Sequence, residues 1–142
     1  MPISTSSAFW EKDLMSGHGT MTVGNDAYRG PYSFKSRFEK GSGTNPEELL
    51  AAAHAGCFSM AFSHALSQAG HVPDRVQTTA KVHLDKVEGG FAITKVELVT
   101  EGKVPGMDQA AFQKTAEEAK KNCPVSKLFA GAQISLTATL SK

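Results

Sequence analysis

Residues 45–66 read NPEELLAAAHAGCFSMAFSHAL, and this stretch predicts the long helix around which the fold is built. Asn45 is a favoured N-cap, and Pro46 suits the first helical position because its missing N–H costs nothing there. Glu48 stands at the third helical position, where its side chain can bond back to the cap. Gly70 is a helix stop signal. We therefore expect a helix that begins at Pro46 and ends at the residue before Gly70.

The predicted helix has no clear polar face between Leu49 and Leu66. A helix that is apolar all round is buried on all sides. Its alanine and glycine residues allow neighbouring elements to approach closely, but one small domain has difficulty surrounding such a helix alone. We expect a partner subunit to cover part of it. A helix sandwiched within one monomer is the alternative.

Alternating apolar and polar residues predict strands on both sides of this helix. Three precede it, at residues 8–11, 20–23 and 32–38, and three follow it, at 76–84, 91–98 and 132–138. In the strand 32–38, Arg37 would lie on the face opposite the three aromatic residues. The alternation changes phase between Ile93 and Val96, which predicts a β-bulge.

A second helix is predicted after Asp108, which can cap it. Its apolar stripe consists of Ala111, Phe112, Ala116 and Ala119, and Cys123 extends that stripe by one turn. The order of elements is then βββ-α-ββ-α-β, which defines an α+β fold. No internal repeat, low-complexity run or linker interrupts it, so residues 1–142 are expected to form a single domain.

The composition and charge of the chain exclude several classes of function. A formal net charge of +1 over 142 residues provides no bulk field to attract nucleic acid or an anionic membrane. Residues 1–7, MPISTSS, lack the cationic and apolar regions of a secretory signal. No stretch reaches the roughly 18 uninterrupted apolar residues typical of a membrane span. We therefore expect a cytoplasmic protein with no nucleic-acid or membrane partner.

The chain has two cysteines, Cys57 within the long helix and Cys123 at the end of the second helix. In the cytoplasm such a pair is rarely a permanent disulfide, so it points to thiol redox chemistry. The thiolate is the reactive form, and an ordinary cysteine is only about 3% thiolate at pH 7. Lowering the pKa by ~2 units would need ~2.7 kcal/mol and would give about three-quarters thiolate.

A cation must lower the pKa of Cys57, because this residue lies in the middle of a helix and burial alone would raise the pKa. Arg37 is the best-placed candidate, and Glu47 is the natural carboxylate to orient it. Glu47 and Cys57 are ten positions apart, or about 15 Å along a continuous helix, so they do not touch within one helix. Either Arg37 spans much of this gap, or Glu47 of another chain lies near Cys57. We favour the second arrangement.

Other interpretations of these residues remain open. Free cysteines are among the most buried residue types, so both thiols could serve packing alone in a non-catalytic stress protein. Arg37 could be a solvated strand residue. His54 lies one turn before Cys57 and could act as the base of a Cys–His hydrolase. A metal site is disfavoured, because the chain has no CxxC or HxxxH motif and a closed zinc site needs four ligands.

Several segments together resemble the OsmC family of osmotically inducible, thiol-dependent peroxidases. They are RFE at 37–39, GTNPEEL at 43–49, AHAGCFSM at 53–60, LDKV at 84–87, GFAITK at 90–95 and CPVS at 123–126. The resemblance covers essentially the whole chain. The segments at 53–60 and 84–87 are more similar to the OsmC subfamily than to the organic hydroperoxide resistance proteins of the same superfamily.

This resemblance implies an OsmC-like fold and an intertwined homodimer with two active sites at the subunit interface. It implies reduction of organic hydroperoxides, and less efficiently of hydrogen peroxide, in oxidative and osmotic stress defence. The reductant would be a dithiol of the lipoyl type, with no metal, haem or other cofactor. Cys57 matches the peroxidatic cysteine, which would form a sulfenic acid, and Cys123 matches the resolving cysteine, which would form a disulfide with it. Arg37 matches the activating arginine, and Glu47 matches the glutamate that pairs with it.

Overall fold

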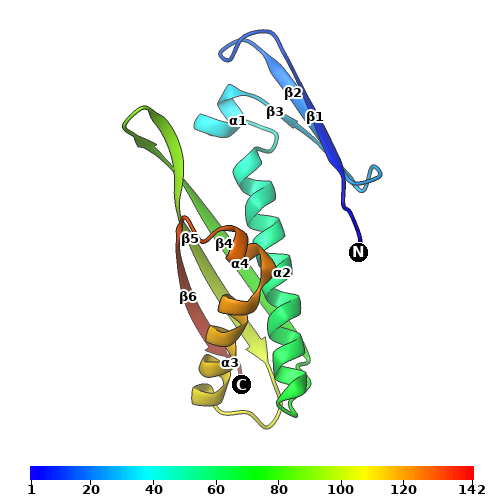
Figure 1. Ribbon diagram of the computed structural model, residues 1–142, viewed down its shortest axis with the longest axis vertical. Helices are drawn as coiled ribbons and strands as arrows, with labels where there is room; N and C mark the ends of the chain where they lie inside the picture. The colour runs from blue at the N-terminus through cyan, green and yellow to red at the C-terminus, as the bar shows by residue number, and fades with distance from the viewer. The chain divides into compact units, whose positions relative to one another are not determined.

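The structure is a computed structural model that describes residues 1–142. The chain divides into two compact units, Met1–Leu49 and Leu50–Lys142. Helix α2, Pro46–Gln68, begins in the first unit and continues through the second (Figure 1). The single domain expected over residues 1–142 stays a prediction.

The first unit contains a three-stranded antiparallel sheet in the order β1-β2-β3. Its strands are β1, Ser6–Glu11, β2, His18–Val23, and β3, Tyr28–Tyr32. The strands predicted at 8–11 and 20–23 are confirmed within β1 and β2. Pro31 is accommodated in β3 because this strand lies at an edge of the sheet, where a missing N–H is tolerated.

The strand predicted at residues 32–38 is wrong, because Phe34–Phe38 forms a short helix, α1. Ser33 caps this helix, and its hydroxyl accepts a hydrogen bond from the Ser36 amide at 3.1 Å. The Ser36 hydroxyl reciprocates by accepting a hydrogen bond from the Ser33 amide at 2.8 Å, which completes a capping box. The local polar residues therefore favour a helix over an extended strand.

The aromatic spacing that suggested a strand also fits a helix. Phe34 and Phe38 are four positions apart, and residues at this spacing share one face of a helix. Their ring centroids lie 4.9 Å apart. The guanidinium carbon of Arg37 lies 5.4 Å from the centroid of the Phe38 ring, so Arg37 does not occupy an opposite face.

Helix α2 begins at Pro46, as its sequence signals predict, and ends at Gln68, one residue before the expected end. The Asn45 side-chain oxygen accepts a hydrogen bond from the Glu48 amide at 2.8 Å, and Gly70 follows the helix with φ of 91°. The role expected for the Glu48 carboxylate is wrong in one detail. It accepts a hydrogen bond from the Thr44 hydroxyl at 2.7 Å instead of from the cap amide.

One side of α2 is buried, and the other is exposed. The buried side carries His54, Phe58, Phe62 and Leu66, which recur every four residues. On the exposed side, Met60 retains 77% of its accessible surface, and Ala52, Ala53 and Gly56 are exposed as well. The expected burial on all sides is therefore wrong within the second unit, because nothing in that unit covers this apolar face. By length and hydropathy α2 would be able to cross a membrane, but core helices of soluble proteins pass the same test.

The second unit contains a three-stranded sheet in the order β4-β5-β6. Its strands are β4, Arg75–Val87, β5, Gly90–Lys103, and β6, Gln133–Leu140. β4 and β5 are antiparallel, whereas β5 and β6 are parallel. All three predicted strands are confirmed, and the first two are longer than expected.

The β-bulge predicted in the fifth strand is confirmed. His83 pairs with Lys95, but the next residue of β4, Leu84, pairs with Ile93. Thr94 is therefore the extra residue, and its insertion explains the change of phase in the sequence pattern.

Helix α3, Gln109–Asn122, is also confirmed, and its cap is Asp108, whose carboxylate accepts a hydrogen bond from the Ala111 amide at 2.8 Å. The buried stripe differs slightly from the prediction, because Ala111 is exposed and Thr115 is buried. A further short helix, α4, Pro124–Leu128, was not expected. It forms because the extended backbone of Cys123 ends α3 and Pro124 suits the first position of a new helix.

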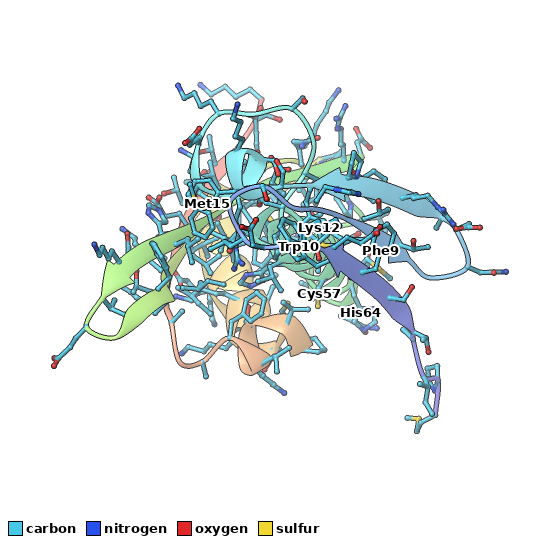
Figure 2. The ribbon with its side chains drawn as sticks, turned by 90° about the horizontal axis from the view of Figure 1, so that it is seen from above. Phe9, Trp10, Lys12, Met15, Cys57 and His64 are labelled. Atoms are coloured by element: carbon cyan, nitrogen blue, oxygen red, sulfur yellow. The ribbon has the colours of Figure 1, made fainter.

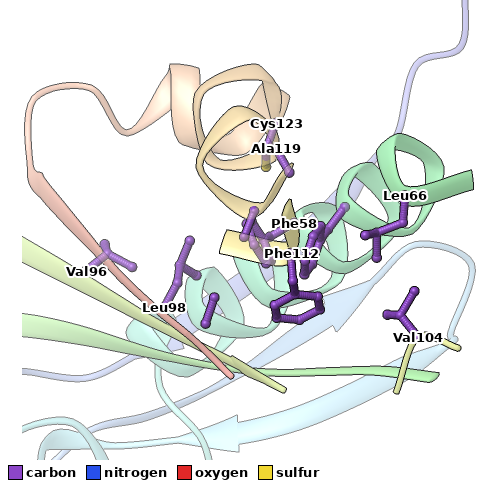
Figure 3. Close-up of a cluster of buried hydrophobic side chains, with 11 residues drawn as sticks. Phe58, Leu66, Val96, Leu98, Val104, Phe112, Ala119 and Cys123 are labelled. Atoms are coloured by element: carbon purple, nitrogen blue, oxygen red, sulfur yellow. The ribbon is translucent and has the colours of Figure 1, made fainter. Parts of the chain in front are cut away.

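The core of the second unit lies between this sheet and helices α2 and α3, which cover one face of it (Figure 1). The buried side chains include Phe58, Phe62 and Leu66 of α2, Val96 and Leu98 of β5, and Phe112, Ala116 and Ala119 of α3. The rings of Phe62 and Phe112 lie 4.9 Å apart. Figure 3 shows Cys123 beside Ala119, so this cysteine is anchored in the core.

Candidate active site

The two cysteines meet in the second unit, although they come from different helices. Cys57 lies in the middle of α2, and Cys123 lies at the junction of α3 and α4. Both are free thiols, and the Cys123 sulfur donates a hydrogen bond to the Cys57 sulfur at 2.9 Å. Cys123 is 0% exposed, whereas Cys57 is partly exposed on α2 (Figure 2). A reagent from solvent therefore reaches Cys57 first.

The immediate surroundings of Cys57 raise its pKa. Burial is the largest cause. The hydrogen bond with Cys123 also raises this pKa, because Cys123 ionises first and Cys57 then keeps its proton as the donor, and the charge of Cys123 acts in the same direction. The Val125 amide opposes them by donating to the sulfur. The sequence argument expected burial to raise this pKa, and that part is confirmed.

The surroundings of Cys123 lower its pKa. Burial is the largest single cause and raises the pKa of Cys123. The hydrogen bond with Cys57 and the polar groups of Ser126 and Val125 lower it, and together they outweigh burial. Sequence reasoning did not identify Ser126 and Val125 as functional residues. Their signal was present, because both belong to the CPVS segment that follows Cys123 directly.

Arg37 and Glu47 form an ion pair in the first unit. The Nε and Nη2 atoms of Arg37 donate to the same oxygen, Oε1 of Glu47, at 3.0 and 2.8 Å. The Glu47 side chain is 9% exposed and that of Arg37 is 36% exposed. Neither hydrogen bond uses Nη1 of Arg37, and the buried Oε2 of Glu47 has no partner.

The structure thus brings the four predicted site residues together as two pairs. Arg37 and Glu47 belong to the unit Met1–Leu49, and Cys57 and Cys123 belong to the unit Leu50–Lys142. Glu47 and Cys57 are ten residues apart on the same helix, which corresponds to about 15 Å of rise. A catalytic role for these four residues stays a prediction.

His54 does not provide the arrangement that a Cys–His hydrolase needs. Its side chain is 0% exposed, and its Nε2 atom is hydrogen-bonded to the Ser126 hydroxyl at 2.7 Å. Burial lowers the pKa of His54. No hydrogen bond joins His54 to Cys57 within residues 1–142, so no observation favours the hydrolase. No three His, Cys, Asp or Glu side chains converge as a metal site would require.

A pocket of 440 Å³ lies in the first unit. It is lined by Trp10, Lys12, Leu14, Tyr32, Ser33, Phe34, Arg37 and Phe38. Figure 2 labels Trp10 and Lys12, which come from β1 and the loop after it. Half of the lining residues are aromatic, and Lys12 and Arg37 add positive charge. Sequence reasoning missed Trp10 and Lys12, because no local motif marks them as site residues.

Comparison with known proteins identifies the family of this chain. The sequence profile of OsmC-like proteins matches residues 39–138. The chain belongs to the OsmC family. It is 50% identical over 123 residues to the peroxiredoxin OsmC of Escherichia coli K12, an alignment that covers 86% of each chain. It is 36% identical over 143 residues to the organic hydroperoxide resistance protein of Xanthomonas axonopodis pv. citri, covering 92% of this chain and 97% of that protein.

Solved structures confirm the α+β fold of this family member. The organic hydroperoxide resistance protein OhrB of Bacillus subtilis superposes with a TM-score of 0.73 at 26% identity, covering 96% of this chain and 98% of that one. An OsmC-like protein from Mycoplasma pneumoniae gives a TM-score of 0.76 at 14% identity over 99% of both chains, which supports the fold alone. With these relatives the predicted enzyme class is confirmed. This OsmC-family chain is a peroxidase of the defence against hydroperoxide stress.

Proposed function

We propose that this chain reduces organic hydroperoxides, and hydrogen peroxide more weakly, through alternating reduction and oxidation of Cys57 and Cys123. The observation that carries the proposal is the 2.9 Å hydrogen bond between their sulfur atoms, with Cys57 partly exposed and Cys123 buried. Two thiols this close need little movement to form a disulfide. The difference in exposure assigns the peroxide to Cys57 and the resolving step to Cys123.

In the first step, the Cys57 thiolate attacks the distal oxygen of the hydroperoxide. The O–O bond breaks, the alkoxide leaves with a proton as the alcohol, and Cys57 becomes a sulfenic acid. In the second step, the Cys123 sulfur attacks the Cys57 sulfur, and the sulfenic hydroxyl leaves as water. An external dithiol then reduces the resulting disulfide by thiol–disulfide exchange and is itself oxidised to a disulfide.

Arg37 is the cation that we assign to the Cys57 thiolate. The residues around Cys57 in its own unit raise its pKa, so an external positive charge is needed. Glu47 occupies the Nε and Nη2 atoms of Arg37 and fixes the plane of the guanidinium group, while Nη1 stays available. Arg37 would then hold the thiolate in the form that attacks the peroxide.

We further propose a homodimer whose active site combines residues of two chains. The exposed apolar side of α2, which includes Met60 and Gly56, offers a surface that a second copy would bury. Glu47 is separated from Cys57 of its own helix by about 15 Å, and it holds Arg37 directly. The Arg37–Glu47 pair of one chain would therefore serve Cys57 of the other.

The pocket beside Arg37 would hold the organic part of the substrate. Its aromatic walls suit an alkyl or aryl group, and Arg37 would draw the peroxide end towards the thiolate.

We place the protein in the cytoplasm, where two free thiols remain reduced and where lipoyl-type dithiols are a suitable reductant. The reaction needs no metal or other cofactor, because both electrons come from thiols.

Consumption of cumene hydroperoxide tests this function. Wild-type protein should turn over many times with dihydrolipoate and far less with a monothiol, because a dithiol completes the exchange within one molecule. Cys57→Ser should abolish turnover. Lys114→Gln is the control, since Lys114 is exposed on α3, away from the proposed interface side of α2. Peroxide reduction that persists in Cys57→Ser would refute the assignment.

A further inference from the structure

His54 is a buried titratable side chain that the peroxidase reaction described above does not use. It is 0% exposed, and the Phe129 ring packs edge-on against it at 5.3 Å. Its one polar contact joins Nε2 to the Ser126 hydroxyl at 2.7 Å, while the buried Nδ1 has no partner. A fully buried histidine with one hydrogen bond needs a reason to be there, since apolar side chains fill such space at less cost.

The unpaired Nδ1 atom indicates which way the histidine–serine hydrogen bond runs. If Nε2 accepted the serine proton, Nδ1 would carry a hydrogen atom with no acceptor, and a buried unpaired N–H is rare. In the other tautomer, Nε2–H donates to Ser126 and Nδ1 carries only a lone pair. This second tautomer leaves the Ser126 proton free for another acceptor.

The Cys123 sulfur is the acceptor within reach of that proton. Cys123 is the N-cap residue of α4 and Ser126 is the third residue of that helix, a spacing that places the Ser126 hydroxyl beside the Cys123 sulfur. The proximity of Ser126 lowers the pKa of Cys123. A buried chain therefore runs from His54 through Ser126 to Cys123, and it joins α2 to the segment that begins α4. Hydrogen bonds in such a chain polarise one another, so the histidine strengthens the bond from serine to sulfur.

We propose that His54 and Ser126 are positioning residues of the resolving step, in which His54 orients the Ser126 hydroxyl to donate to the Cys123 sulfur. This inference rests on the proposed function, because it presumes that Cys123 attacks an oxidised Cys57. The buried series His54–Ser126–Cys123 does not assist the peroxide step at Cys57 and acts on the resolving step alone.

The assisted step is the attack of the Cys123 sulfur on the Cys57 sulfenic acid. Cys123 loses its proton while the Ser126 hydroxyl stabilises the developing negative charge on its sulfur. The sulfur forms the S–S bond to Cys57 as the S–O bond of the sulfenic acid breaks. The departing hydroxide takes up the proton that Cys123 released and leaves as water. Ser126 and His54 keep their own protons throughout.

Cys57 is the one further titratable side chain that contacts the buried series His54–Ser126–Cys123. Cys57 contacts Cys123 from α2, and His54 contacts Ser126 from the same helix. The remaining partners are the amides of Val125 and Ser126 and the ring of Phe129. A shift in the pH dependence of the resolving step is therefore attributable to the two cysteines and the histidine.

The test follows the resolving step directly. Reduced protein is mixed with one equivalent of cumene hydroperoxide, quenched at intervals by alkylation, and analysed by mass spectrometry for Cys57 sulfenic acid and for the disulfide. Ser126→Ala should slow disulfide formation at neutral pH by roughly tenfold, because the Cys123 thiolate loses a hydrogen-bond donor. The rate should recover as pH rises. Formation of the sulfenic acid should keep the wild-type rate.

Conservative variants separate positioning from a purely structural role. Ser126→Thr keeps the hydroxyl and should keep the resolving rate. His54→Gln places an amide donor near the position of Nε2–H and should also keep it, whereas His54→Leu should slow it. Equal rates of disulfide formation in Ser126→Ala and wild type, both with native thermal unfolding, would overturn the proposal. Slowing in His54→Gln equal to that in His54→Leu would overturn the donor role.

This experiment also separates the inference from the proposed function. If wild-type protein forms no disulfide between Cys57 and Cys123 after peroxide, then the proposed function has failed. If wild-type protein forms the disulfide at the same rate as Ser126→Ala across the pH range, only the role of the buried chain has failed.

Discussion

The Cys123 thiol donates a hydrogen bond to the Cys57 sulfur across 2.9 Å, although 66 positions separate the two residues along the chain. The contact joins a partly exposed sulfur on α2 to a fully buried one at the end of α3. A peroxide approaching from solvent meets Cys57 first, and Cys123 is already in place behind it. In the proposed reaction, the order of the two chemical steps follows from this asymmetry.

Removal of the resolving thiol should trap the first step. Cys123→Ser should reduce one equivalent of cumene hydroperoxide and then stop with Cys57 as a sulfenic acid. Excess peroxide should carry that sulfur on to the irreversible sulfinic acid, because no thiol competes for it. Mass spectrometry of the treated variant reads both states. An unmodified Cys57 in that sample would mean that the roles are reversed or that the pair is not catalytic.

Loss of the arginine should raise the pKa of Cys57. In Arg37→Ala the thiolate loses its cation, and we expect the pKa of Cys57 to rise further and the peroxide step to slow. Glu47→Ala should act in the same direction and less strongly, because it only loosens Arg37. The rate of Cys57 alkylation against pH measures this shift.

Glu48→Ala is the matched control for that series. Glu48 follows Glu47 on α2, but it is exposed and its carboxylate binds the Thr44 hydroxyl. Its removal should leave the Cys57 titration unchanged. An unchanged titration in Arg37→Ala as well would show that a different group activates the thiol.

The elements with strong local signals were predictable from sequence. Asn45 and Pro46 mark the start of α2 by chemistry that acts within one turn, and the bulge at Thr94 is visible as a change of phase. Phe34 and Phe38 were misassigned because a spacing of four fits both a strand face and a helix face. Ser33 and Ser36 decide between the two through their capping box.

The site depended on information that local patterns do not contain. The 2.9 Å contact of the two cysteines arises from packing between α2 and the α3–α4 junction, over 66 positions of sequence. The residues alone suggested a redox-active thiol pair, and the family resemblance assigned a role to each cysteine. Ser126 was noted only as part of the CPVS segment, because its hydrogen bond to His54 spans 72 positions of sequence.

Burial of His54 should make stability depend on pH in acid. Burial lowers the pKa of His54 in the folded state, so below about pH 6.5 the unfolded chain binds a proton that the folded chain does not. Stability should therefore fall as pH drops below that value, and the loss should level off once the folded state is protonated too. Urea unfolding at pH 7.5 and 5.5 measures the change.

His54→Gln should lose less stability over this pH interval than the wild type, because glutamine does not titrate. If His54→Gln and the wild type lose equal stability between the two pH values, then His54 is protonated equally in both states.

The packing of Phe112 should make Gly102 intolerant of a side chain. A Cβ atom at Gly102 would lie 2.6 Å from Cε1 and 2.8 Å from Cζ of the Phe112 ring. Gly102→Ala should therefore destabilise the protein by ~1–3 kcal/mol, the usual range for overpacking. Gly131→Ala is the control, because nothing lies within 4 Å of its Cβ position. Phe112→Leu should partly rescue Gly102→Ala; equal denaturation midpoints for both glycine variants would contradict this packing.

A shared active site predicts complementation between two inactive chains. Cys57→Ser lacks the nucleophile, and Arg37→Ala lacks the activating cation. In a mixed dimer, one site would combine Cys57 of the Arg37→Ala chain with Arg37 of the Cys57→Ser chain. Both residues at that site are then wild type. Refolding the two variants together should therefore recover part of the peroxidase activity, up to half that of wild type when every dimer is mixed.

The two arrangements of the site give different results in that mixture. If Arg37 serves Cys57 of its own chain, each site of the mixed dimer lacks one residue and activity stays absent, even with mixed dimers proven by differential tagging. Refolding each variant alone controls for residual activity. A protein that sediments as a monomer at micromolar concentration would remove the shared site altogether. The apolar side of α2, with Met60 77% exposed in one chain, leads us to expect the dimer and recovered activity.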